Sequence, residues 1–117
     1  MGLSTHVLDT MHGVPAAGMA VRLYAMGLSE PQLMRAVTLN DDGRNPEGLL
    51  IEHAALAAGR YRLSFDVAGY FERRGVVLPQ PNFLDWVHLD FGVAEPQAHY
   101  HVPLLVSPWS YSTYRGS

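Results

Sequence analysis

The chain has 117 residues, of which 48% are hydrophobic and 16% are charged. This composition is typical of a packed globular domain and unlike that of a disordered chain. The formal net charge of −3 at pH 7 indicates neither a nucleic-acid groove nor a polybasic membrane patch. Because the chain contains no cysteine, disulfides, thiolate metal sites and redox chemistry through sulfur are excluded.

No apolar run approaches the roughly 18 residues of a membrane helix, and no basic segment followed by an apolar one indicates a signal peptide. We therefore expect no membrane association and a cytoplasmic location. No internal repeat, linker or low-complexity segment divides the sequence. The sequence predicts one domain over residues 1–117.

Eight prolines and 11 glycines separate short apolar stretches, which is typical of an all-β domain with frequent turns. In chain order, strands are predicted at residues 4–9, 19–24, 33–39, 60–67, 84–91, 98–106 and 110–115. The clearest is 60–67, where apolar and polar residues alternate with the period of a half-buried strand. One short helix is predicted at residues 68–74. Seven or eight short strands with this spacing predict an antiparallel β-sandwich of two sheets.

The histidines are candidates for chemistry, because imidazole is the natural general acid or base near neutral pH. His99 and His101 lie two apart in the predicted strand 98–106, so they share one face. The other face is apolar and belongs to the core; it consists of Tyr100, Val102, Leu104 and Val106. The histidine pair therefore faces solvent or a partner subunit. Pro103 cannot donate a hydrogen bond to a neighbouring strand, which predicts an edge or a bulge there.

Each candidate also has an ordinary interpretation. Two strand histidines are most often surface residues, and a single His6 is more often a passive polar side chain. Arg44 follows an Asp-Gly turn, where a solvated arginine is usual, and Arg115 lies close enough to the chain end to fray. His12, His53 and His88 belong to no constellation. Composition and periodicity alone predict a β-sandwich without an assigned function.

Two segments carry a resemblance to a known family. Residues 3–10 read Leu-Ser-Thr-His-Val-Leu-Asp-Thr, and residues 13–18 read Gly-Val-Pro-Ala-Ala-Gly. Residues 99–117 read His-Tyr-His-Val-Pro-Leu-Leu-Val-Ser-Pro-Trp-Ser-Tyr-Ser-Thr-Tyr-Arg-Gly-Ser. Both closely resemble the 5-hydroxyisourate hydrolases, and the final Tyr-Arg-Gly-Ser separates these enzymes from the hormone-carrying transthyretins. Asp42-Gly43-Arg44 matches the internal arginine turn of the family, whereas residues 79–86 and Val106 depart from its pattern away from the expected site.

The resemblance implies a transthyretin-like sandwich that hydrolyses 5-hydroxyisourate to 2-oxo-4-hydroxy-4-carboxy-5-ureidoimidazoline without a cofactor. Opening a cyclic amide needs an activated water, stabilisation of an oxyanion and a proton for the leaving nitrogen. By resemblance, His6 and His101 activate the water and transfer protons, with the order left open, and His6 also contacts substrate. Arg44 would hold and polarise the oxygen-rich ring through its forked donors.

The resemblance extends the site into the C-terminal tail. Tyr114 would help to bind the substrate, and Arg115 and Ser117 would shape the pocket. His99 and Tyr111 would position the residues of the site without contacting the substrate themselves. The family also implies a homotetramer, built as a dimer of dimers, with the sites in a channel between dimers; a histidine face turned away from its own core is consistent with such an interface.

Two alternatives remain open from sequence. The first is a transthyretin-type protein that binds a small molecule without catalysis, because fold does not fix function; the titratable groups and the tail argue against it. The second is a zinc site, since His-x-His on a strand with a third histidine is a credible ligand set. His6, His99 and His101 would then hold zinc adventitiously and not for catalysis.

Overall fold

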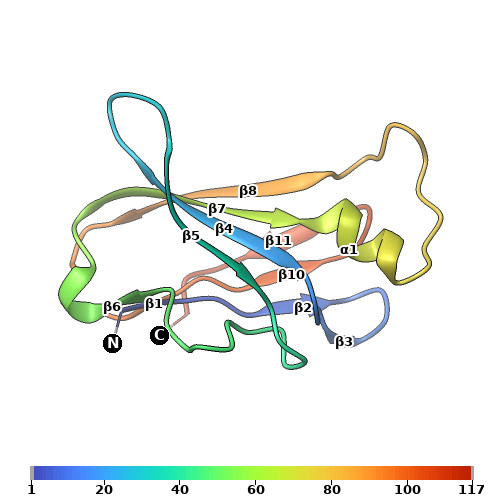
Figure 1. Ribbon diagram of the computed structural model, residues 1–117, viewed down its shortest axis with the longest axis horizontal. Coiled ribbons are helices and arrows are strands. Elements are labelled where there is room, and N and C mark those ends of the chain that lie inside the picture. Colours follow the sequence, from blue (N-terminus) through green and yellow to red (C-terminus); the bar gives the residue numbers. More distant parts are fainter. Residues whose placement is uncertain (1, 117) are drawn as a thin grey trace.

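One layer of the structure is an antiparallel sheet of four strands in the order β5-β4-β7-β8. The computed structural model, which describes residues 2–116, places this sheet over a second layer of strands (Figure 1). The strands of the first sheet are β4 (Ala20–Met26), β5 (Gln32–Thr38), β7 (Gly59–Asp66) and β8 (Trp86–Val93). All four overlap strands predicted from the sequence.

The second layer consists of two short sheets that lie end to end. Their orders are β6-β1-β9 and β11-β10-β2-β3. Their bounds are β1 (Gly2–Ser4), β2 (Val7–Asp9), β3 (Val14–Pro15), β6 (Ile51–Glu52), β9 (Tyr100–His101), β10 (Leu104–Val106) and β11 (Tyr111–Thr113). Backbone hydrogen bonds from Val102 to Ser4 and from Leu104 to His6, both 2.9 Å, bridge the gap between the two sheets. The N-terminal and C-terminal strands therefore stay side by side along their whole length.

The direction of this pairing differs from the prediction. Strand β1 runs parallel to β9, and β2 runs parallel to β10, whereas an entirely antiparallel sandwich was expected. Antiparallel pairing is favoured where a short turn joins two strands. Ser4 and His101 are 97 positions apart in sequence, so no hairpin sets their direction. The all-β sandwich with one short α-helix is confirmed.

The core lies between the two layers and follows the alternation read from the sequence. In β7, Leu63 and Phe65 are fully buried. In the N-terminal strands, Leu3, Thr5 and Val7 are buried, while Ser4, His6 and Leu8 are only partly buried. Residues that alternate with the core positions consequently lie on the outer face of the second layer.

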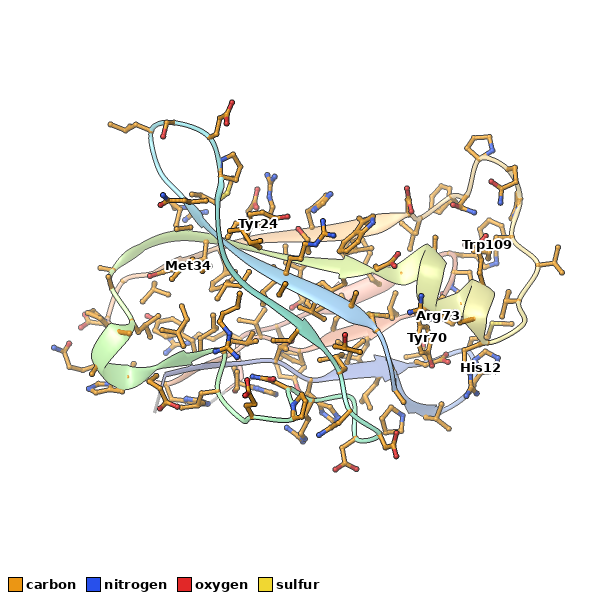
Figure 2. All side chains as sticks on the ribbon, in the orientation of Figure 1. His12, Tyr24, Met34, Tyr70, Arg73 and Trp109 are labelled. Atoms are coloured by element: carbon orange, nitrogen blue, oxygen red, sulfur yellow. The ribbon has the colours of Figure 1, made fainter. Side chains whose placement is uncertain are left out.

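The predicted helix is α1 (Val67–Arg73), one residue earlier than expected. Asp66 ends β7 and caps the helix, because its side chain accepts a hydrogen bond from the backbone nitrogen of Gly69 at 3.1 Å. Figure 2 places Tyr70 of this helix close to His12 of the β2–β3 turn. No helix within residues 2–116 is long and apolar enough to cross a membrane.

The remaining differences concern short elements. The predicted strands 4–9 and 98–106 are each divided into two shorter strands. The first corresponds to β1 and β2, and the second to β9 and β10. Pro103 lies in the second interruption, in keeping with its missing N–H group, but β10 is not an edge strand because it pairs with both β2 and β11. Strands β3 and β6 and the 3-10 helix η1 (His53–Ala55) were not predicted, because two or three residues are too few to establish a period.

Candidate active site

His6 and Arg44 are neighbours because the N-terminal strand pairs with a turn. Their backbones form an antiparallel bridge in the gap between β1 and β2. Strand alternation directs Thr5 and Val7 into the core and leaves His6 half-buried on the outer face. The His6 Nε2 atom lies 2.9 Å from the carbonyl oxygen of Asp42. The imidazole is thus held from one side by the turn that also carries Arg44.

The turn itself is fixed by Asn40 and Gly43. The Asn40 Oδ1 atom accepts hydrogen bonds from the backbone nitrogens of Asp42, at 2.9 Å, and Arg44, at 3.1 Å. Gly43 has φ +72°, and a Cβ at this position would collide with the carbonyl oxygen of Val7, so only glycine fits. None of the ion pairs found within residues 2–116 involves Arg44, which leaves its guanidinium available to an anionic ligand.

His101 reaches the same face from the C-terminal strand. The parallel register of β1 and β9 places His101 beside Ser4, and the Ser4 Oγ atom lies 2.8 Å from His101 Nδ1. The same Oγ atom lies 3.2 Å from His99 Nε2, and His99 Nδ1 accepts a hydrogen bond from the backbone nitrogen of Gly2 at 3.2 Å. Sequence reasoning missed Ser4. Its position two residues before His6, on the same strand face, was the signal that could have found it.

Burial and the charge of Arg44 both favour the neutral form of the two imidazoles. Burial lowers the pKa of His6, and the positive charge of Arg44 lowers it further against a smaller opposing effect of Asp42. Burial also lowers the pKa of His101, followed by the charges of Arg44, His6 and His99. Neutral imidazoles can accept a proton or donate an N–H at neutral pH. Arg44 therefore acts on both rings at once.

The C-terminal tail returns to His101 after β11. The backbone nitrogen of Gly116 donates to the carbonyl oxygen of His101 at 2.7 Å. A Cβ on Gly116 would lie 2.8 Å from His101 Cδ2, so the absent side chain permits the close approach. The Arg115 guanidinium lies 4.2 Å over the Tyr100 ring and donates to the His99 carbonyl oxygen at 3.4 Å. The tail is thus tied to the histidine strand.

Other predicted site residues lie further away within one chain. Tyr114 is 60% exposed and lines a cavity of about 310 Å³ together with Arg115 and residues of β8. Tyr111 pairs with Val106, at the opposite end of the β10–β11 ladder from His101, so the structure does not bring it to the cluster. Ser117 lies outside the described residues.

The alternative zinc site would use His6, His99 and His101. Within residues 2–116, no group of three or more His, Cys, Asp or Glu side chains is arranged to hold a metal ion. The Ser4 hydroxyl lies between His99 Nε2 and His101 Nδ1, within hydrogen-bond distance of one nitrogen of each ring.

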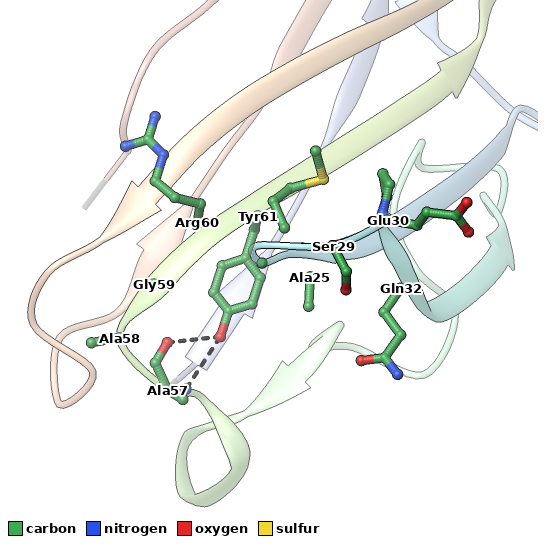
Figure 3. A pocket seen from close by; sticks show the side chains of 12 residues that line it. Ala25, Ser29, Glu30, Gln32, Ala57, Ala58, Gly59, Arg60 and Tyr61 are labelled. Atoms are coloured by element: carbon green, nitrogen blue, oxygen red, sulfur yellow. Dashed lines mark hydrogen bonds between the residues drawn. The ribbon is translucent and has the colours of Figure 1, made fainter.

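A cavity of about 550 Å³ lies elsewhere, between the β4–β5 hairpin and residues 57–61. Figure 3 shows its lining, with the Tyr61 hydroxyl directed at Ala57, to whose carbonyl oxygen it donates at 2.7 Å. The lining contains Glu30 and Arg60 but no histidine. It therefore lacks the pair of imidazoles that makes the His6–His101 cluster suited to proton transfer.

The chain is similar to several known proteins. A family model described as the HIUase/Transthyretin family matches residues 3–116. A protein of Ralstonia nicotianae named 5-hydroxyisourate hydrolase is 55% identical over 98% of this chain and 97% of its own. The solved structure of 5-hydroxyisourate hydrolase from Klebsiella pneumoniae is 32% identical, with TM-score 0.80 and full coverage of both chains.

A crystal structure of (S)-allantoin synthase is also similar, with 42% identity and TM-score 0.93. The match covers 99% of this chain but 43% of that longer protein, so it relates this chain to one part of it. Together with the family model, which spans nearly all the described residues, these likenesses lead to one conclusion. The chain belongs to the HIUase/transthyretin family.

Proposed function

We propose that this protein hydrolyses 5-hydroxyisourate to 2-oxo-4-hydroxy-4-carboxy-5-ureidoimidazoline. The observation that carries the proposal is the convergence of His6, Arg44 and His101 on one face of the sandwich, in a chain 55% identical to a protein named for this activity. The reaction adds water across a carbon–nitrogen bond and changes no oxidation state, so the proposed chemistry uses no cofactor.

The residues supply the three things that amide hydrolysis needs. An imidazole of the pair His6 and His101 takes a proton from the attacking water. Arg44 presents forked donors to the oxygens of the substrate and stabilises negative charge as it develops. The tail shapes the site next to His101 through Arg115, and Tyr114 contacts the substrate. His99 supports His101 through Ser4. The role of Ser117 in the pocket rests on the family resemblance alone.

A transthyretin-type carrier is the second candidate, since the matched family includes both kinds of protein. The cluster argues against it. Small-molecule sites are usually apolar with few polar groups, whereas here the charge of Arg44 acts on two half-buried histidines. Such an arrangement suits a reaction better than passive binding of an apolar ligand.

The test is a coupled assay in which urate oxidase generates 5-hydroxyisourate, and its ultraviolet absorbance is followed with and without the protein. We expect faster decay with no metal added. His6→Asn and His101→Asn should each lower kcat by roughly 10²-fold or more, the scale of a lost general acid or base, and His99→Asn should cost less. If 5-hydroxyisourate decayed at the spontaneous rate in the presence of folded wild-type protein, the proposed hydrolase activity would be wrong.

A further inference from the structure

The proton positions on the histidine rings follow from what each nitrogen contacts. A backbone N–H can only donate, so His99 Nδ1, 3.2 Å from the Gly2 nitrogen, accepts a hydrogen bond. A neutral imidazole carries one proton on one of its two nitrogens. His99 therefore holds its proton on Nε2, and this N–H group donates to the Ser4 Oγ atom 3.2 Å away.

The Ser4 hydroxyl continues the same donor-to-acceptor direction of hydrogen bonding from His99 to His101. Its Oγ atom accepts from His99 and lies 2.8 Å from His101 Nδ1. Within residues 2–116 these two rings are the hydrogen-bond partners of the Ser4 hydroxyl, so the hydroxyl proton is satisfied by pointing at His101 Nδ1. His101 Nδ1 is then an acceptor, and the proton of the neutral ring is on Nε2.

His6 has a different partner from His101. Its Nε2 atom lies 2.9 Å from the Asp42 carbonyl oxygen, which can only accept. His6 therefore carries its proton on Nε2 and keeps the lone pair on Nδ1. Both rings hold their proton on Nε2, and in His6 the Asp42 carbonyl oxygen accepts it. Among the contacts of residues 2–116, the Nδ1 lone pair of His6 and the Nε2–H of His101 have no hydrogen-bond partner.

We propose that Ser4 is a positioning residue that fixes His101 as a hydrogen-bond donor and so leaves His6 as the base of the reaction. The inference rests on the proposed hydrolysis of 5-hydroxyisourate. It adds an assignment that neither the fold nor the family match makes, because it depends on a hydroxyl between two rings and on a backbone N–H at Gly2.

The steps balance with these roles. His6 Nδ1 takes a proton from water as the water oxygen bonds to the amide carbonyl carbon. His101 stays neutral and donates its Nε2–H to the oxyanion, as a neutral imidazole can. When the carbon–nitrogen bond breaks, its electron pair goes to the nitrogen, which receives the proton held by His6. One water is consumed, and both rings return to their starting tautomers.

The tautomers can be read directly from the full-length protein labelled with ¹⁵N-histidine. Long-range ¹H–¹⁵N NMR at about pH 8, well above the ordinary histidine pKa, separates protonated from unprotonated ring nitrogens; His6→Asn and His101→Asn assign the signals. We expect the proton on Nε2 of both rings, with His101 Nδ1 unprotonated. A proton on His101 Nδ1 in the wild-type protein overturns the proposal without the need for any Ser4 variant.

Variants of Ser4 provide the second test. Ser4→Ala should lower kcat roughly 10-fold, because a misplaced catalytic group loses rate, and should change KM less than about 2-fold, since no substrate contact is removed. Its His101 Nδ1 signal should also move. Ser4→Thr keeps the hydroxyl and should retain most of kcat. Ser64→Ala is the matched control: it removes a 2.7 Å serine–histidine contact to His88 in the other sheet and should leave kcat unchanged.

Wild-type kcat in Ser4→Ala, or equal losses in Ser4→Ala and Ser4→Thr, would overturn the role of the hydroxyl. Failure of the proposed function is a separate result. In that case the wild-type protein does not accelerate decay of 5-hydroxyisourate, while the NMR measurement still reports whether Ser4 sets the His101 tautomer.

Discussion

A single charge, that of Arg44, acts on both imidazoles of the site. Burial is the first reason that the pKa values of His6 and His101 lie below the usual histidine value, and Arg44 is the second for each ring. The base must be neutral to accept a proton, so activity is lost as pH falls through the lowered pKa. Arg44, which we propose binds the substrate, should thereby also extend activity toward acid pH.

Replacement of Arg44 should separate these two roles. In the wild-type protein, kcat/KM should be level near neutral pH and fall only below about 6.5, the unperturbed histidine pKa. In Arg44→Gln the pKa values rise, so the acid limb should move to higher pH while overall activity falls. Arg44→Lys keeps the positive charge but loses the forked donors of the guanidinium. It should lower kcat/KM and leave the acid limb of the pH profile where it is in the wild-type protein. Stopped-flow decay of preformed 5-hydroxyisourate between about pH 5 and 8 measures these pH profiles. If the acid limb of Arg44→Gln coincided with that of the wild-type protein, Arg44 would not lower the pKa of the catalytic imidazole.

At the scale of elements, α1 is attached to the N-terminal strands by a buried carboxylate. Asp9 of β2 is 1% exposed; it accepts hydrogen bonds from the Tyr70 hydroxyl at 2.7 Å, and from the backbone nitrogen and Nδ1 of His12 at 3.0 and 2.6 Å. Burial alone would raise the pKa of Asp9, but these donors outweigh it and lower the pKa. Burial and the Asp9 carboxylate raise the pKa of Tyr70, so its hydroxyl stays a donor.

Tyr70→Phe should destabilise the fold by about 1–3 kcal/mol, the cost of leaving a buried acceptor without a partner. Because the folded pKa of Asp9 is lowered, its contribution is present above pH 3.8, the unperturbed value, and is lost as pH falls through the folded pKa. Without the Tyr70 donor the folded pKa of Asp9 should rise, so the contribution should be smaller and its loss complete at a higher pH. Urea unfolding at neutral and acid pH measures both effects, with Tyr24→Phe in the other sheet as control. A variant as stable as wild type would show that His12 alone satisfies Asp9.

The elements differ in how far the sequence predicts them. Strand β7 and helix α1 were predictable because alternation and turn chemistry act over neighbouring residues. The interruptions in 4–9 and 98–106 were not, since the alternation continues through Thr5-His6 and Val102-Pro103 without a break. Parallel pairing depends on contacts 97 positions apart and leaves no local signal. For the same reason Arg44 was assigned to the site only through the family resemblance, and Ser4 was missed.

For the whole molecule, the open position of the cluster bears on assembly. His6 and His101 lie on the outer face of the second layer, and within residues 2–116 one chain leaves both only partly buried. We therefore expect the proposed homotetramer, a dimer of dimers, whose second subunit would cover this face. Light scattering should report four copies of the 12.9 kDa chain. A stable monomer with full activity would contradict a site shared between subunits.

Removal of residues 114–117 should leave folding and assembly intact and lower kcat/KM by roughly 10²-fold, because the tail residues that position His101 are lost.

The contact between Gly116 and His101 allows a more specific test, since a Cβ at position 116 would lie too close to the His101 imidazole. Gly116→Ala should therefore reduce activity without altering assembly. Circular dichroism and scattering establish that both variants are intact. If the truncated protein retained the wild-type kcat/KM, the tail would have no role in catalysis.

The parallel pairing of the first and last strands also has a consequence for biosynthesis. Ser4 of β1 is synthesised before its partner His101 of β9, which follows it by 97 positions. Proteins are synthesised from the N-terminus, far more slowly than local structure forms. Strand β1 therefore remains without its parallel partner β9 until the ribosome has passed His101. A nascent chain that stops before residue 99 can pair His6 with Arg44 but lacks the second imidazole of the proposed site.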